Sequence, residues 1–235
     1  MLKNSKCEEK ERSSPLPEND AIMESELLQK LANKSMTKEM LLQKVKQNFN
    51  LVPEVLNGVS SSKAAIRYGC AKVLMDLSEE QPETLYPYMG SFIPLLYSKY
   101  RILTWNAMAI LANMAKVDVD RKFDAVFDKY YSYLNDAYMV TVANVVGNSA
   151  KIALAKPHLI KKITNELLKV EKISTTAHLT EECKRVIAEH AIKSFALFFD
   201  KIEQKEKVIS FALRHLDSPR KTLRKAAEDF LTKFR

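Results

Sequence analysis

Residue types that perform catalysis occur in this sequence, but they are not arranged in any motif that catalysis uses. A phosphate-binding loop needs closely spaced glycines whose backbone wraps the anion, and no two of the four glycines lie within ten residues of each other. A zinc site needs clustered histidine and cysteine ligands, yet the nearest candidates, Cys183 and His190, offer two ligands at most. The G-x-S-x-G signature of a serine nucleophile is also absent. We therefore predict no catalytic residue, no metal site and no cofactor.

Uncharged polar side chains, in contrast, recur at helical spacing through the middle of the chain. Two segments, LANMAK (111–116) and VGNSAK (146–151), share the pattern small-Asn-x-Ala-Lys. Extending this superposition to neighbouring segments collects positions three, four or seven residues apart, which share one face of a helix. They are Lys72, Asp76, Asn106, Asn113, Thr141, Asn144, Asn148, His190 and Ser194. Glu and Lys serve helix solubility better than Asn, Thr and Ser do, so this stripe indicates hydrogen bonding, either to a binding partner or to neighbouring helices.

Positive charge is concentrated near the C-terminus. The chain carries a formal charge of +8, and residues 156–235 alone hold 18 basic and 11 acidic side chains, a net +7. The last predicted helix pair gathers a basic cluster, which we define as Arg214, Arg220, Lys221, Arg224, Lys225, Lys233 and Arg235. Such a cluster binds phosphates in a nucleic acid. It equally provides the polar outer face that the terminal unit of a repeat array needs.

The elements that position these residues are predicted to be helices joined by short polar turns. Four glycines in 235 residues are too few for the turns and bulges of a sheet protein. Residues 1–20 mix charge, serine and proline without periodicity, which predicts a disordered tail, and 21–49 resemble a capping helix pair. We predict one helical repeat domain over 21–235.

The charged N-terminus, the lack of a long apolar run and three scattered cysteines favour a cytoplasmic protein without a membrane span.

From residue 51 onward, a helix rich in large apolar residues alternates with a helix rich in alanine. Matching Ile66, Leu103, Val140, Cys183 and Leu223 gives spacings of 37, 37, 43 and 40 residues. Self-similarity at this period is typical of a helical repeat array, in which the pairs stack because no single pair buries its own apolar stripe. We call this alignment the apolar register. In the third pair counted from residue 51, it differs by two residues from the asparagine register, which is the alignment that superposes LANMAK on VGNSAK. Within the array, Pro87 and Pro94 should bend or break a first-row helix.

The segment LDSPRKTLRKAAEDFL (216–231) resembles a HEAT repeat, with Asp217 in the turn, then Leu223-Arg224 and Ala226-Ala227; Ile66-Arg67 with Cys70-Ala71 is similar. The resemblance covers roughly 51–235. It implies an all-α fold, a right-handed α-α superhelix (HEAT-like α-solenoid) of about five to six helix pairs. It also implies a hydrogen-bonded ladder between repeats that involves Arg67, Asp217 and Arg224, although Thr104 and Thr141 replace the arginine in the middle repeats.

In such arrays the second-row helices line an extended concave surface, which is the usual docking face. The polar stripe lies on these helices. We therefore predict a non-catalytic scaffold or adaptor whose concave surface binds another protein or a peptide. The alternative is a HEAT-like nucleic-acid-binding protein, similar to those of DNA repair, that uses the basic C-terminal repeats. No small-molecule substrate is indicated.

Overall fold

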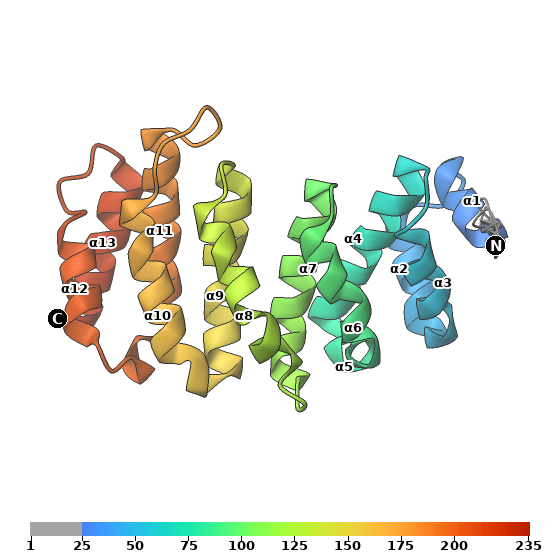
Figure 1. The fold of residues 1–235 in the computed structure, drawn as a ribbon, viewed down its shortest axis with the longest axis horizontal. Coiled ribbons are helices and arrows are strands. Elements are labelled where there is room, and N and C mark those ends of the chain that lie inside the picture. The colour runs from blue at the N-terminus through green and yellow to red at the C-terminus, as the bar shows by residue number, and fades with distance from the viewer. Residues whose placement is uncertain (1–24) are drawn as a thin grey trace, which may run out of the picture.

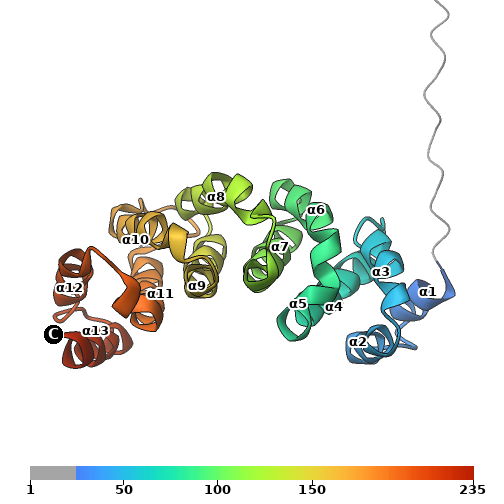
Figure 2. The same cartoon turned by 90° about the horizontal axis from the view of Figure 1, so that it is seen from below.

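The computed structural model describes residues 25–235, which form a curved stack of helices (Figures 1 and 2). The predicted tail over 1–20 and the first residues of the predicted capping pair lie outside the described residues. Within residues 25–235, the only β-structure is an isolated bridge between Thr176 and Leu179. The predicted all-α superhelical repeat fold is confirmed.

The helices form two rows along the arc, and the chain passes from one row to the other within each pair. The N-terminal pair is α1 (Glu26–Ala32) and α2 (Lys38–Gln47). The outer row continues with α3 (Val52–Gly58), α5 (Pro82–Leu85), α6 (Met89–Phe92), α8 (Lys122–Ser132), α10 (Ile160–Leu168) and α12 (Lys205–Leu213). The inner row contains α4 (Ala64–Glu80), α7 (Arg101–Met114), α9 (Met139–Ala155), α11 (Glu181–Phe198) and α13 (Lys221–Phe234). The six pairs of the described chain agree with the predicted five to six.

The inner-row helices provide the continuity of the array. Each packs against the next, from α2 through α4, α7, α9 and α11 to α13, and Figure 2 shows them along the inside of the curve. One apolar cluster extends from Leu28 to Leu231. The middle helix α7 is buried on nearly all sides, with only Trp105 and Ala109 partly exposed between Leu103 and Ala115. This explains why its sequence is apolar all round.

The outer-row member that precedes α7 is broken, as its prolines predict. It alternates between α5, the 3₁₀ turn η2 (Tyr86–Tyr88), α6 and the 3₁₀ helix η3 (Ile93–Tyr97). A proline inside a helix removes a backbone donor, and its ring clashes with the carbonyl four residues earlier. Pro87 and Pro94 each fall near the start of a 3₁₀ segment, where the regular α-helical ladder is interrupted.

The burial pattern decides between the two predicted registers. Leu103 is 3% exposed, whereas Val140, its partner in the apolar register, is 47% exposed. When α7 is aligned with α9 by a shift of 35 residues, most buried positions of one helix coincide with buried positions of the other. A shift of 46 residues gives the same agreement between α9 and α11. The apolar register was therefore wrong for α9, because valine occupies both the exposed position 140 and the buried position 142. The register of the asparagine stripe is the one the structure adopts.

The predicted ladder between repeats is also corrected. Arg67 donates from Nη1 to the carbonyl oxygens of Ser61 (2.8 Å) and Ser62 (3.1 Å), and Arg224 donates to that of Ser218 (2.6 Å). Each arginine thus closes the turn of its own repeat. Asp217 is exposed and forms no hydrogen bond with the rest of the described chain. The carbonyls of the turn lie within reach of the guanidinium, and they take the place of the expected carboxylate.

Contacts between arginine and tyrosine join neighbouring repeats instead. The Arg67 guanidinium lies 3.9 Å from the ring centre of Tyr100, and that of Arg101 lies 3.7 Å from the ring centre of Tyr138. Tyr100 and Tyr138 are the N-cap residues of α7 and α9. In both cases an arginine of one inner-row helix covers the residue from which the next one starts. Attraction between the cation and the ring face stabilises such stacks.

Candidate functional site

The concave surfaces of α4, α7, α9 and α11 together form the candidate site, which we call the groove. The register of the fold superposes one residue from each helix, or from the 3₁₀ turn η4 (Ala115–Val117) that continues α7, at four successive levels along the helix axes. These levels are Tyr68, Trp105, Val140 and Val186; Lys72, Ala109, Asn144 and His190; Asp76, Asn113, Asn148 and Ser194; and Glu79, Lys116, Lys151 and Leu197. The floor is therefore apolar near the N-terminal ends of these helices and more polar towards their C-terminal ends.

Three members of the predicted polar stripe bond to neighbouring helices rather than standing free. Asn113 donates to Ser78 Oγ of α4 (2.9 Å) and accepts from Lys151 Nζ of α9 (2.8 Å). Ser194 donates to the Val146 carbonyl (2.8 Å), and Thr141 accepts from Trp105 Nε1 (3.0 Å). These contacts join α4 to α7, α7 to α9 and α9 to α11. At these positions the structure shows the alternative use that the sequence allows, hydrogen bonding between helices.

Asn106 is also turned into the array. It is buried, its Nδ2 lies 3.2 Å from Met75 Sδ, and its Oδ1 has no hydrogen-bond partner within the described chain. Thioether sulfur is a weak acceptor, so Asn106 is poorly satisfied where α4 meets α7.

The remaining members of the stripe reach the groove surface. Lys72 and Asp76 form an ion pair one turn apart on α4. Asn144 and Asn148 are partly exposed, and each donates Nδ2 to the backbone carbonyl four residues earlier, at 2.9 Å. His190 is exposed. These side chains are accessible to a ligand from the inside of the arc.

Glu189, next to His190, is a buried carboxylate that joins α11 to α13. It accepts hydrogen bonds from Lys193 Nζ (2.6 Å), Thr222 Oγ1 (2.5 Å) and Arg220 Nε (3.0 Å). Burial raises the pKa of this carboxyl, but the hydrogen bonds outweigh burial and lower the pKa to about 2. The negative charge is therefore permanent at physiological pH, and it compensates cations that would otherwise attract an external anion.

Comparison with known proteins identifies the architecture. No protein-family model matches the sequence, and no curated protein matches it. Among solved structures, a designed armadillo repeat protein in complex with the peptide (KR)4 is 17% identical with a TM-score of 0.59, covering 88% of this chain and 91% of that one. Computationally designed armadillo repeat proteins for modular peptide recognition are 19% identical with a TM-score of 0.60, covering 88% and 92%. The chain is an armadillo- or HEAT-like α-solenoid.

The solenoid leaves apolar side chains uncovered on its inner row that the sequence did not single out. Ile102 is 43% exposed, Val140 47%, Leu154 44% and Leu197 65%. The apolar register predicts that Val140 is buried, as Leu103 is. The asparagine register places Val140 level with Trp105 on the groove. That alignment could therefore have predicted that Val140 is exposed.

A hollow of about 420 Å³ opens in the groove between α4, α7 and α9. Glu79, Lys116 and Lys151 provide its charges, Asn113 lies at its base, and Ala112, Leu154 and Ala155 form its apolar wall. Lys151 Nζ lies 3.1 Å from Glu79 Oε1 and 2.8 Å from Asn113 Oδ1. Lys116 is exposed and has no ion pair within the described residues. The hollow therefore combines an oriented ammonium group with an uncompensated one.

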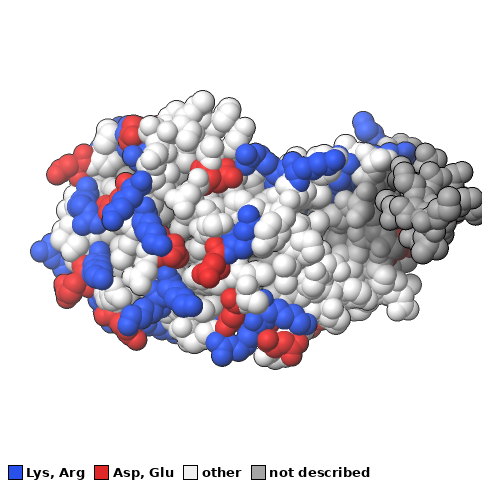
Figure 3. All heavy atoms as spheres, in the orientation of Figure 1, with Lys and Arg blue, Asp and Glu red and all other residues white. Residues whose placement is uncertain are grey.

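The solenoid does not bring the predicted basic cluster together. Arg214 pairs with Glu171, Arg220 with Glu182 and Glu189, and Lys225 with Asp229. Arg220 and Lys221 lie at the start of α13, whereas Lys233 and Arg235 lie at its end, about 20 Å away at 1.5 Å per residue. On the face shown in Figure 3, basic and acidic side chains are interspersed over the C-terminal half.

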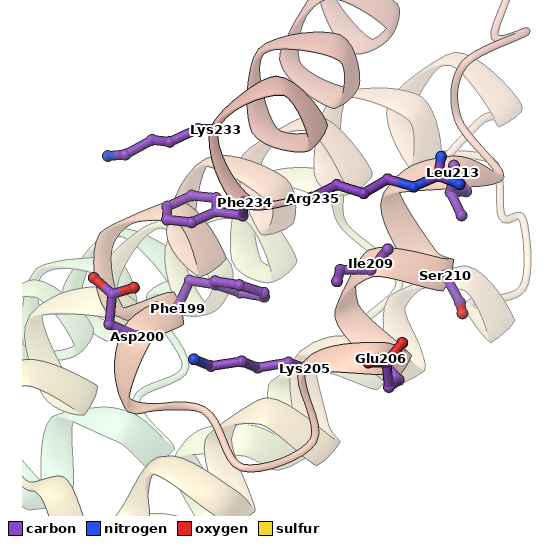
Figure 4. Close-up of a pocket in the computed structure, with 10 residues that line it drawn as sticks. All are labelled: Phe199, Asp200, Lys205, Glu206, Ile209, Ser210, Leu213, Lys233, Phe234 and Arg235. Atoms are coloured by element: carbon purple, nitrogen blue, oxygen red, sulfur yellow. The ribbon is translucent and has the colours of Figure 1, made fainter.

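A second hollow, of about 800 Å³, lies at the C-terminal end of the solenoid. Phe199 and Phe234, whose ring centres are 4.6 Å apart, form part of its wall. Its charged residues, which include Lys205, Lys233 and Arg235, point in different directions (Figure 4). They do not converge on one ligand atom.

Two further classes of site find no support in the described part of the chain. No group of three or more His, Cys, Asp or Glu residues there is placed to hold a metal ion. No helix between residues 25 and 235 is both long and apolar enough to cross a membrane.

Proposed function

We propose that this protein is a non-catalytic scaffold or adaptor that binds a segment of another protein along the groove. The observation that carries the proposal is the set of large apolar side chains left 43–65% exposed on inner-row helices: Ile102, Val140, Leu154 and Leu197. Apolar groups grouped on one functional surface and edged by polar residues are typical of interaction sites.

The shape of the surface supports a peptide-like partner. The groove runs across four stacked helices, and polar groups such as Asn144, Asn148 and His190 alternate with apolar groups along it. A chain segment needs both kinds of contact, because its side chains fill apolar sites and its backbone hydrogen-bonds. The designed armadillo proteins of the same fold include one in complex with a peptide, which agrees with this use of the surface.

Two glycines provide a matched test. Gly147 of the inner-row α9 and Gly90 of the outer-row α6 are both exposed, and apart from the adjoining residues and backbone of its own helix, neither has an atom within 4 Å of the position that a Cβ would occupy. Tryptophan at position 147 should obstruct the groove, whereas tryptophan at position 90 should leave it open. Both variants should fold, because each added side chain enters solvent.

The experiment is a pull-down from untreated and nuclease-treated lysate of the source cells with tagged wild type, Gly147→Trp and Gly90→Trp, read by mass spectrometry. We expect a protein to be retained by wild type and by Gly90→Trp and lost from Gly147→Trp. Equal capture by both glycine variants would place binding outside the groove. Capture that disappears after nuclease treatment would instead favour the nucleic-acid alternative.

A further inference from the structure

We infer that the segment held in the groove contains acidic residues with apolar residues next to them, and that the ammonium groups of Lys116 and Lys151 bind its carboxylates. The inference rests on the proposed function of the groove and specifies the chemistry of its partner. It also assigns the 420 Å³ hollow between α4, α7 and α9 as the anchoring site.

The charge balance in the middle of the groove is the first observation. The two central inner-row segments, residues 101–117 and 139–155, contain no Asp or Glu, and their cations are Arg101, Lys116 and Lys151. Asp76 and Glu79 of the groove both lie on α4, and each already pairs with a lysine. Arg101 pairs with Asp136. A basic segment would therefore find no free carboxylate at the centre, while an acidic one would meet the uncompensated ammonium group of Lys116 beside the oriented one of Lys151. Complementary charge sets this kind of selectivity.

The second observation is that the anchoring site is built from the core outward. Ser78 is fully buried and fixes the amide of Asn113, which is 7% exposed. Asn113 in turn accepts from Lys151 Nζ at 2.8 Å, and Glu79 lies at 3.1 Å from the same nitrogen. The Lys151 ammonium is therefore held at the hollow before a ligand arrives, and less side-chain entropy is lost on binding. Lys116 lines the same hollow with no acidic partner in the described chain.

The third observation concerns what surrounds these charges. Ala112, Leu154 and Ala155 form the wall of the hollow, and Leu154 is 44% exposed. A carboxylate placed between the two lysines brings the neighbouring residues of its chain against this wall. The wall favours an acidic residue followed or preceded by an apolar one. An acidic segment without apolar residues would leave Leu154 uncovered.

A nucleic acid is also anionic, but the groove suits it less well. Phosphodiester binding requires cations repeated along the backbone path. The central inner-row helices instead expose apolar Ile102 and Val140. Other cations are already compensated, Lys72 by Asp76 and Lys193 by Glu189. The peptide is therefore the occupant that these observations favour.

The test is selection of a random peptide library displayed on phage against the whole chain at ~150 mM salt, followed by sequencing. We expect enriched peptides with an excess of Asp and Glu over Lys and Arg, and with apolar residues next to the acidic ones. A synthetic copy of one enriched peptide should bind Lys116→Glu about tenfold more weakly than wild type, because a favourable contact becomes repulsive. Lys116→Glu breaks no ion pair, so folding should be retained.

A charge-matched pair of double variants completes the design. Lys116→Glu/Lys151→Glu should abolish the acidic preference. Lys201→Glu/Lys207→Glu changes the net charge equally, at two exposed lysines outside the groove, and should retain the preference. Loss of the preference in both doubles would show that it reflects overall charge and would overturn the inference.

The remaining outcomes separate the inference from the proposed function. If peptides rich in Lys and Arg are enriched and Gly147→Trp blocks them, the groove binds peptides but the inference is wrong. If no peptide is enriched, or if enrichment survives Gly147→Trp, both are wrong. A single-stranded DNA oligonucleotide that binds at the same salt, is blocked by Gly147→Trp and displaces the peptides would overturn the inference in favour of nucleic acid.

Discussion

Lys156 and Asp118 form an ion pair inside the solenoid, next to the turn that precedes α8. Their side chains are 4% and 0% exposed, and Lys156 Nζ lies 2.8 Å from Asp118 Oδ2. The same carboxylate accepts from the backbone nitrogens of Lys122 (2.8 Å) and Phe123 (2.9 Å), which begin α8. Burial raises the pKa of the Asp118 carboxyl, but the hydrogen bonds from Lys156 and from the backbone outweigh it and lower the pKa. One carboxylate thus connects the end of α9 to the start of α8.

Lys156→Met should lower the free energy of unfolding by about 3–5 kcal/mol, because it leaves the Asp118 charge buried without its partner. Urea denaturation measures the loss. The double variant Lys156→Met/Asp118→Asn removes both charges and should recover part of the stability. Equal losses in the single and double variants would show that packing of the lysine stem, rather than charge compensation, stabilises this turn.

At the level of single residues, the sequence predicts which helix face a side chain occupies but not how far a neighbouring helix covers it. Asn113 and Asn148 share one level of the stripe, yet Asn113 is 7% exposed and Asn148 is partly exposed. Asn113 meets Ser78 on the preceding helix. Periodicity within one helix contains no information on that contact. The roles of the stripe and of the basic cluster in binding remain predictions.

At the level of elements, two glycines in the middle of inner-row helices face opposite environments. A Cβ added at Gly69 of α4 would lie 2.7 Å from Leu31 Cδ2 and 3.2 Å from its Cγ, so α1 packs directly against the glycine. A Cβ added at Gly147 of α9 would meet nothing within 4 Å. The first glycine permits close helix packing, while the second only weakens its helix.

Alanine substitutions should therefore have opposite effects at the two positions. Gly147→Ala should raise the free energy of unfolding by about 0.5–1 kcal/mol, because alanine restricts the unfolded backbone and favours the helix. Gly69→Ala should lower it by about 1–3 kcal/mol, because the buried Leu31 side chain must move. Thermal and urea unfolding of the two variants beside wild type measure both signs. Stabilisation by both substitutions would mean that α1 adjusts its position at little cost.

The sequence predicts most elements because two strong signals agree, the apolar period and the proline positions. Pro87 and Pro94 predict the broken outer helix, and the structure alternates α and 3₁₀ segments there. The register of α9 depended on a choice between Val140 and Val142. Both are β-branched and apolar, so local sequence could not separate them. Only contact with α7 and α11 buries one and exposes the other.

For the whole molecule, the repeat period predicts a stacked array, and its inner row predicts the side on which a groove lies. The period does not predict which levels of that groove stay open. That depends on the hydrogen bonds and ion pairs formed across three helices at once, such as those of Lys151 with Glu79 and Asn113. These residues lie up to 72 positions apart in the chain.

The stacked arrangement also predicts how stability is distributed. In an array each repeat contacts only its neighbours, so internal units are stabilised from two sides and terminal units from one. The helix α7 packs against both α4 and α9, whereas α13 packs mainly against α11 and α12. Hydrogen–deuterium exchange followed by mass spectrometry should therefore show the slowest exchange in α7 and α9 and faster exchange in α1 and α13.

A ligand in the groove should change this profile in a position-dependent way. An acidic peptide from the selection touches the 3₁₀ turn that follows α7 through Lys116 and α9 through Lys151, so it stabilises units that are already the most stable. Coupling between neighbours then slows exchange in α4 and α11 more visibly than in the centre, because their opening is more frequent at the outset. Gly147→Trp with the same peptide should show no such change, and Gly90→Trp should behave as wild type does. Uniform slowing from α1 to α13 would instead mean that the solenoid opens as one cooperative unit and that its repeats are not energetically separable.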